Sequence, residues 1–401
     1  MTADDLVFGI YPGGAVGDEN GGLLQGPPDD PERITEALDH LRVSLVRGYV
    51  SFTDPGDAYP QAPERVERYA TGGRMLDLVA QYRSRSGDVA GYVAFVRDLV
   101  RRHGARVATL QVTEEPNLPI YDGGHPRVLE ALVEGVVAAK EEARLLGLDH
   151  LRVGFNTTPL FGPAEGFVAA LTADGGPRFV AALDYVGLDF FPDVFQPAPA
   201  DGLGEAVAGL LGHHRDRCLT PAGIDESVPL WITENGWPTG PDRSPQRQAD
   251  VLETIVTAVV NCRIRRNIGG YTHFALRDAD STKPGLFYRF GLLTDDYRPK
   301  PAFDTYQRLV KRFGVHSRFP HRDRVVYVGG ENNTTNPVPR GFPGTGRSIP
   351  EGHSRAAVSR RPVHDGPTST RRPGVDPVRE AMIPREGREP GSEAVRWNPR
   401  R

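Results

Sequence analysis

Short apolar runs alternate with longer amphipathic segments along the first 315 residues. The run Leu6 to Tyr11 is apolar almost throughout, which is typical of a strand buried on both faces. Residues 31–41 instead place Ile34, Leu38 and Leu41 on one face of a helix, with Asp30 available as its N-cap. Eight runs of the first kind predict strands at 6–11, 43–46, 74–80, 107–113, 151–155, 185–190, 230–233 and 270–276.

Helical segments lie between these strands. We predict helices at 31–41, 64–70, 88–103, 127–146, 166–171, 179–182, 204–215, 246–262 and 302–313. Eight strands that alternate with helices over about 315 residues predict a (β/α)8 TIM barrel at 1–315. A doubly wound open sheet is the alternative, but Gly13 and Gly14 are not followed by the GxGxxG phosphate loop that such sheets carry after their first strand.

The pattern stops after Val315. Residues 316–401 are rich in Arg, Pro, Ser and Gly without periodicity, and we predict that this tail is disordered. The tail contains 16 Arg, no Lys and 9 Asp+Glu, a net charge of +7; since the whole chain has −4, residues 1–315 carry −11. An acidic folded part argues against nucleic acid as its main partner, although the arginines of the tail could contact an acidic partner.

The beginning of the chain carries no basic region followed by a long apolar run, so we predict neither a signal peptide nor a membrane span, and a cytoplasmic location. The two cysteines, Cys218 and Cys262, have no CxxC spacing, which favours reduced thiols and no metal site. The composition, 38% hydrophobic and 25% charged, is that of a globular protein. Nothing in it indicates an oligomeric state.

Two of the predicted strands end in carboxylates. Leu230 to Thr233 leads into Glu234 and then into the loop NGWPTG, while the strand at 107–113 leads into Glu114, Glu115 and Pro116. The carboxyl ends of the strands form the catalytic face of a barrel, so these acids are expected to meet there. Cleavage of a glycosidic bond needs one protonated and one charged carboxyl group, which makes this the favoured chemistry.

The stretches ITENGWPT, EEPNL and LRDADS … FGLL … RPKPAF resemble the retaining glycoside hydrolases of clan A, and the order of elements extends the resemblance over residues 6–313. It implies Glu115 as acid/base, because Glu115 directly precedes Pro116, and Glu234 as nucleophile. It also implies that Arg47 hydrogen-bonds the nucleophile. A carbohydrate or glycoside is the implied substrate, with no cofactor.

The chain departs from that family at three places. Glu114 stands where the family usually has an Asn that contacts the sugar, the strand at 185–190 ends in Phe190 and Phe191, and Phe274 replaces a frequent Trp. Neighbouring residues of a strand point to opposite sides, so Glu114 and Glu115 can both face the barrel mouth only if the strand has bent.

Three further candidates for the site each have two interpretations. Arg47 could pair with Asp77 instead of Glu234. Trp237 could be a platform for a sugar ring or an anchor of its loop. Arg277 could bind substrate or pair with Asp278. Tyr11, Tyr49 and Asn156, also at strand ends, are weaker candidates for the wall of the site.

The predicted function is a retaining hydrolase of β-linked glycosides that works by double displacement. A transglycosidase and a barrel that binds carbohydrate without cleaving it are the alternatives. A barrel that handles phosphorylated metabolites is disfavoured, because the loops after the last two strands lack the glycine-rich character of phosphate sites.

Overall fold

The computed structural model describes residues 6–18, 20–195 and 201–315. Eight parallel strands close into a barrel in the order β1-β10-β9-β8-β7-β6-β5-β4. β1 pairs with β10 on one side and with β4 on the other, so the sheet has no edge. The predicted (β/α)8 fold is confirmed and the open doubly wound sheet is excluded. The strands are β1 (Val7–Ile10), β4 (Leu45–Thr53), β5 (Met75–Arg83), β6 (Val107–Val112), β7 (Arg152–Thr157), β8 (Tyr185–Asp189), β9 (Leu230–Asn235) and β10 (Ile268–His273).

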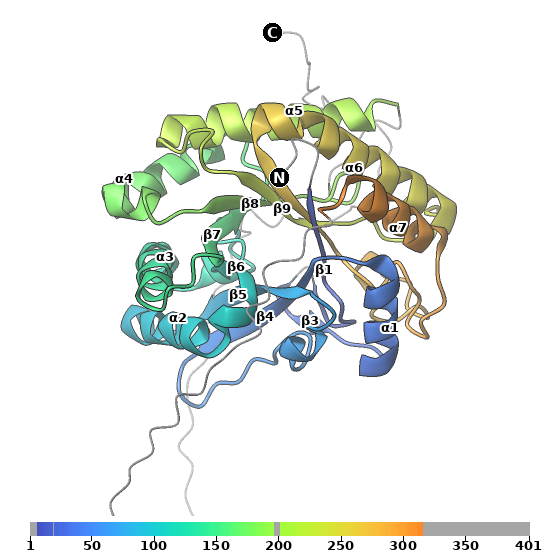
Figure 1. Cartoon of the computed structure of the whole chain (residues 1–401), viewed down its shortest axis with the longest axis horizontal. Helices are drawn as coiled ribbons and strands as arrows, with labels where there is room; N and C mark the ends of the chain where they lie inside the picture. Colours follow the sequence, from blue (N-terminus) through green and yellow to red (C-terminus); the bar gives the residue numbers. More distant parts are fainter. Residues whose placement is uncertain (1–5, 19, 196–200, 316–401) are drawn as a thin grey trace, which may run out of the picture. The chain divides into compact units, whose positions relative to one another are not determined.

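Helices surround the barrel (Figure 1). Asp30 caps the first of them, because its Oδ1 accepts the backbone N–H groups of Glu32 and Arg33 at 3.0 and 3.2 Å. The three residues predicted to share the apolar face of that helix are all buried. The helices are α1 (Pro31–Leu41), α2 (Val89–His103), α3 (Val128–Leu145), α4 (Phe167–Val180), α5 (Leu203–His213), α6 (Pro245–Arg266) and α7 (Pro301–Phe313).

Several observed elements differ from the predicted ones, and the strand expected at 270–276 runs instead from Ile268 to His273. The two helical pieces expected at 166–171 and 179–182 overlap the two ends of one helix, α4, which Gly176 interrupts with a φ of 64°. β4 and β5 continue beyond their apolar parts, because they remain paired as far as Thr53 and Arg83. The helix expected at 64–70 is a short 3-10 helix, η1 (Val66–Tyr69), and the first loop contains an unpredicted hairpin of β2 (Val16–Gly17) and β3 (Leu23–Leu24).

The barrel interior is apolar at one end and polar at the other. The apolar layer contains Trp231, which is 3% exposed. Leu45 and Met75 belong to the same layer, and Arg47 and Asp77 follow two residues later on the same strands. Side chains two apart in a strand share a face, so this arginine and aspartate point into the barrel nearer its carboxyl end. The apolar layer consists of Val7, Leu45, Met75, Ala108, Tyr185 and Trp231.

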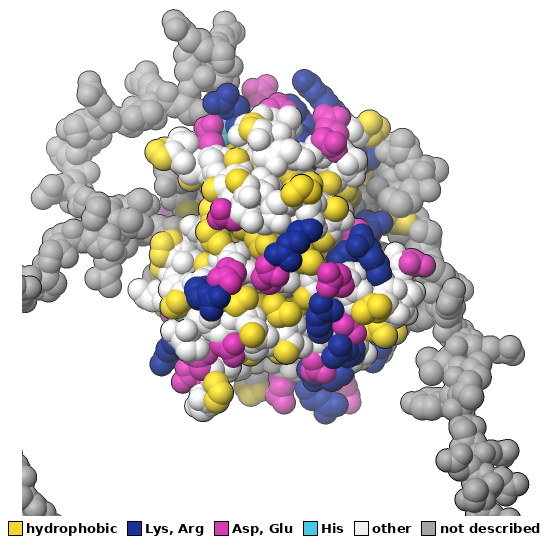
Figure 2. All heavy atoms as spheres, turned by 90° about the vertical axis from the view of Figure 1, so that its left-hand side faces the viewer, with side chains coloured by type: hydrophobic (Ala, Val, Ile, Leu, Met, Phe, Trp, Pro, Cys, Tyr) yellow, Lys and Arg dark blue, Asp and Glu magenta, His cyan; other side chains and the backbone are white. Residues whose placement is uncertain are grey.

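The outer surface carries acidic and basic side chains side by side, as the face in Figure 2 shows. Between α2 and α3, Arg97 contacts Glu141 at 2.6 Å and Arg101 contacts Glu142 at 2.7 Å. Among the described helices, none combines the length and the apolar character needed to cross a bilayer. Cys218 and Cys262 are both free thiols, as expected. The tail predicted to be disordered, 316–401, lies outside the described residues.

Candidate active site

Glu234 lies near the carboxyl end of β9 and is 7% exposed. Its Oε1 accepts a hydrogen bond from Arg47 Nε at 3.3 Å and another from the hydroxyl of Tyr49, both on β4. The other carboxylate oxygen accepts no hydrogen bond from the residues that the structure describes. Glu234 is therefore held through one oxygen by a cation and a hydroxyl, while the second oxygen stays available for chemistry.

Arg47 is fully buried and satisfies both of the interactions considered for it. Its Nη1 donates to Asp77 Oδ2 at 2.9 Å and its Nη2 to Gln111 Oε1 at 2.8 Å, in addition to the contact with Glu234. Burial lowers the pKa of Arg47, but the neighbouring Tyr49, Asp77 and Glu234 outweigh it and leave that pKa above its ordinary value. This arginine is therefore a permanent positive charge beneath the site.

The chain bends sharply where β6 ends. Thr113 and Glu115 both have left-handed φ angles, 66° and 42°, which is uncommon for residues other than glycine. Asp122 holds this bend, since its Oδ2 accepts the backbone N–H of Glu114 at 2.8 Å and that of Tyr82 at 2.7 Å. Because the strand has already ended, the two neighbouring glutamates are released from the alternation that would send them to opposite sides.

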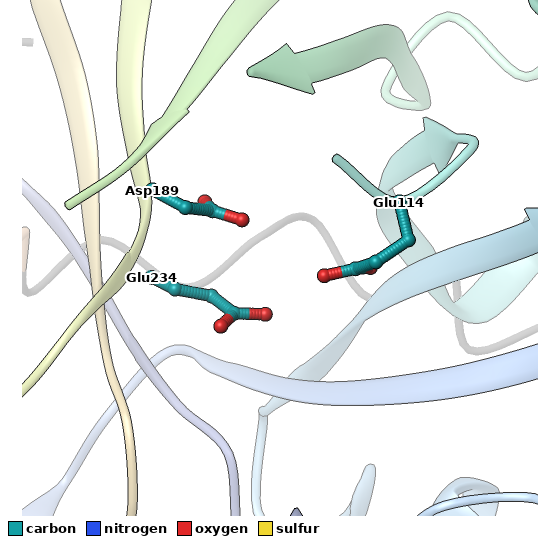
Figure 3. Close-up of side chains that lie close together, drawn as sticks. All are labelled: Glu114, Asp189 and Glu234. Carbon is teal, nitrogen blue, oxygen red and sulfur yellow. The ribbon is translucent and has the colours of Figure 1, made fainter. Parts of the chain in front are cut away.

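Glu114, Asp189 and Glu234 point toward a common point, as Figure 3 shows. Each offers one carboxylate oxygen, and these three atoms lie within 4.8 Å of one another. They come from the loop after β6, from the last residue of β8 and from β9. Three carboxylate oxygens at this spacing could also bind a divalent cation. Within the described part of the chain, no other group of three acids, cysteines or histidines lies close enough together to do so.

Glu115 is anchored through its backbone. Its N–H donates to Asn156 Oδ1 at 2.9 Å, and the amide nitrogen of Asn156 donates in turn to Asp189. Thr233 donates to the other oxygen of Asp189. Gly187 makes this arrangement possible, because a Cβ at that position would lie 2.5 Å from Thr233 Oγ1 and 2.9 Å from Asn156 Cβ.

The site contains more buried acids than buried bases. Burial raises the pKa of Glu114, and the nearby Glu234 adds to it. Burial likewise raises the pKa of Glu115, with Asp189 and Glu234 as further causes. The pKa of Asp189 is raised by burial first and by Glu234 next. Acids that interact with the same neighbours titrate as one coupled set and not one by one.

Four other residues predicted for the site lie around it in different ways. Tyr11 is buried, and its ring stacks on Phe274 at 5.1 Å and meets Tyr49 edge-on at 5.4 Å. Phe274 is partly exposed and is thus available to a ligand. Trp237 is only 3% exposed, with Arg243 over its ring at 4.5 Å, an arrangement that favours the loop anchor over the sugar platform.

Arg277 has no exposed surface and pairs with Asp29 at 2.6 Å rather than with Asp278. Its Nη1 and Nη2 also donate to the carbonyl oxygen of Pro27 at 3.1 Å. Asp278 pairs with Lys300 at 2.7 Å instead. These contacts give Arg277 the role of tying the first loop to the end of the barrel.

The sequence did not indicate Asp189, a member of the acid cluster, or Gln111, which contacts it, and it indicated Tyr49 only weakly. Asp189 was hidden in the apolar run YVGLDF, and Gln111 lay inside the strand at 107–113. Tyr49, a weak candidate from sequence, donates to Glu234. The available signal was a polar residue inside an apolar strand, because burying a polar group without a hydrogen-bond partner costs free energy.

No protein-family model matches the chain. A probable glucan endo-1,3-beta-glucosidase of Aspergillus niger, eglC, is 29% identical to it over 138 residues. These residues are 33% of this chain and 27% of that protein, so the match spans about a quarter of the relative's length.

Two solved structures share the architecture at low sequence identity. A family 39 glycoside hydrolase from Bacteroides cellulosilyticus matches with a TM-score of 0.50 and 16% identity, covering 77% of this chain and 64% of its own. A β-glucosidase from Exiguobacterium marinum matches with a TM-score of 0.50 and 14% identity, covering 77% and 98%. The chain has the barrel fold of these glycoside hydrolases. The resemblance inferred from the sequence motifs is therefore confirmed for the fold, and the roles of individual residues depend on the geometry above.

Proposed function

We propose that the protein is a retaining glycoside hydrolase that cleaves a β-linked glycoside, with Glu234 as nucleophile and Glu115 as acid/base. The observation that carries the proposal is the environment of Glu234, a strand-end carboxylate with Arg47 and Tyr49 on one oxygen and its other oxygen unpaired. A firmly positioned carboxyl group with one oxygen open to the reacting carbon is what attack on an anomeric carbon requires.

Glu115 fits the role of proton donor. Its carboxyl group accepts no hydrogen bond from the described residues, and burial together with Asp189 and Glu234 raises its pKa. A raised pKa keeps a carboxyl group protonated near neutral pH, so that it can protonate the leaving oxygen. In the second step the same group, now ionised, would take a proton from the water that releases the sugar.

The names of the relatives, a probable glucan endo-1,3-beta-glucosidase and a β-glucosidase, make β-glucosides the first substrates to test. The test is turnover of 4-nitrophenyl β-glucoside and of β-1,3-linked glucose oligomers by the whole chain. We expect Glu234→Ala and Glu115→Gln to abolish turnover with the fold intact. Glu142→Gln is the matched control, because Glu142 is equally buried but pairs with arginines on the outer helices.

Added azide separates the two roles. It should restore the Glu115 variant by replacing water in the second step, with a β-glycosyl azide as product. In the Glu234 variant it should attack directly and give the α-anomer. Binding of an oligosaccharide by the wild-type chain, without any product, would instead support the non-hydrolytic barrel.

A further inference from the structure

The buried charges of the site do not balance. Five carboxyl groups that are at most 7% exposed lie around Arg47. Among the described residues, every ion pair made by these five groups has Arg47 as its basic partner. Two neighbouring carboxyl groups in a buried site cannot both be ionised at low cost, which is why paired carboxyl groups share a proton. Even with Glu115 protonated as the acid, negative charges remain in excess. The five acids are Asp77, Glu114, Glu115, Asp189 and Glu234.

The hydrogen-bond donors show where an additional proton belongs. Glu234 accepts from a guanidinium and a hydroxyl, and Asp189 accepts from Thr233 and Asn156. Among the described residues, Glu114 accepts a hydrogen bond only from Gln111 Nε2, at 3.3 Å, and this donor is shared with the carbonyl oxygen of Thr113 at 3.0 Å. Donors to a carboxylate favour its charged form, so the acid with the weakest set of donors is the one that stays neutral.

The geometry of the three acids gives that proton a use. A point can be found no more than about 2.8 Å from all three of the oxygens that lie within 4.8 Å of one another, and this is a normal distance for O–H···O hydrogen bonds. A sugar hydroxyl at that point donates one hydrogen and accepts others. Three charged carboxylates could only accept, whereas one protonated member supplies the missing donor.

We propose that Glu114 remains protonated in the active enzyme and donates a hydrogen bond to a hydroxyl of the bound sugar, between Asp189 and Glu234. It is a positioning residue, distinct from the acid/base, and the inference rests on the proposed function. Burial and the charge of Glu234 raise the pKa of Glu114, which agrees with this assignment. The titratable and charged groups that interact with it are Arg47 and Tyr49 on β4, Tyr59 in the loop after β4, Glu115 and Tyr121 in its own loop, Asp189 on β8 and Glu234 on β9.

Glu114→Gln imitates the protonated side chain at every pH, because an amide is uncharged and donates N–H. We expect both limbs of the pH profile of kcat/KM to stay at the wild-type pH values, whatever change in kcat/KM the new amide causes. If Glu114 is ionised in the active enzyme, the substitution removes a negative charge and both limbs move to lower pH, a result that would overturn the proposal.

Glu114→Leu keeps the volume but cannot donate. We expect about a tenfold loss of kcat/KM on 4-nitrophenyl β-glucoside, the usual size of a neutral hydrogen bond. That loss should vanish against one member of a series of monodeoxy glucosides, the one that lacks the bound hydroxyl. An equal loss against every deoxy substrate would mean a merely structural effect and would contradict the inference.

Infrared spectroscopy tests the proton without any turnover. The difference between wild type and Glu114→Gln at pH 7 should contain the C=O stretch of a protonated carboxyl group. A carboxylate band in its place overturns the inference and leaves the proposed function standing. The band of a protonated carboxyl group in a protein that turns over no glycoside contradicts the proposed function, while Glu114 is still protonated. Calorimetric binding of Ca²⁺ or Mg²⁺ that Glu114→Gln abolishes would also overturn it, in favour of a cation between the three acids.

Discussion

Tyr49→Phe removes a single oxygen atom from the candidate site. The hydroxyl of Tyr49 donates to Glu234 Oε1 and accepts from Arg47 Nε at 2.8 Å. The ring packs edge-on against Tyr11 and lies 5.2 Å from the guanidinium of Arg47, and phenylalanine keeps both contacts. A hydrogen bond to a charged group contributes about 1.5–3 kcal/mol. If that stabilisation is lost in the transition state, kcat/KM falls roughly 10- to 150-fold.

The assay is hydrolysis of 4-nitrophenyl β-glucoside from pH 4 to 9. Tyr271→Phe is the control, because Tyr271 is equally buried and donates to Asn235 Oδ1 at 2.7 Å, away from the carboxylate. A Tyr49 variant with kcat/KM within twofold of wild type would refute the role given to this hydroxyl.

Two further predictions concern stability. Burial lowers the pKa of His273 from 6.5 to about 3, so as pH falls from 6 to 4 the unfolded chain gains a proton that the folded chain does not. Urea unfolding of His273→Leu should therefore lose less stability over this range, by about 1.4 kcal/mol per pH unit relative to wild type, and equal slopes would contradict the assignment. Lys300→Met removes the partner of buried Asp278 at 2.7 Å and should lower the free energy of unfolding by about 3–5 kcal/mol at pH 7, but by less at pH 4, where Asp278 can take up a proton. An equal loss at both pH values would show that packing, and not charge, is what the lysine supplies.

The fold could be predicted from the sequence because its signals are local. Apolar runs such as 230–233 and helical faces such as that of 31–41 report burial within a single element. The alternating order of these elements then leaves few topologies, and a closed parallel barrel places the carboxyl end of every strand at one face. Glu234 could be located for the same reason, since it follows directly from the end of an apolar strand.

The details of the acid cluster depend on contacts between distant segments. Thr113 and Glu115 adopt left-handed φ angles without being glycine, and the carboxylate of Asp122 holds that bend. No local pattern predicts such a conformation. Asp189 could not be distinguished from the apolar residues around it until Thr233 and Asn156 were found beside it. The number of acids in the site, and hence its proton, followed only from the assembled barrel.

The central claim is that Glu234 attacks the anomeric carbon, and trapping the covalent intermediate tests it most directly. A 2-deoxy-2-fluoro-β-glucosyl fluoride slows the second step of a retaining enzyme, so the sugar should remain attached to the protein. Mass spectrometry of the digested protein should find one added fluorosugar on the peptide that contains Glu234, and none in Glu234→Ala. A sugar attached to another carboxyl group would contradict the account, as would hydrolysis of an unmodified glucoside with inversion of configuration.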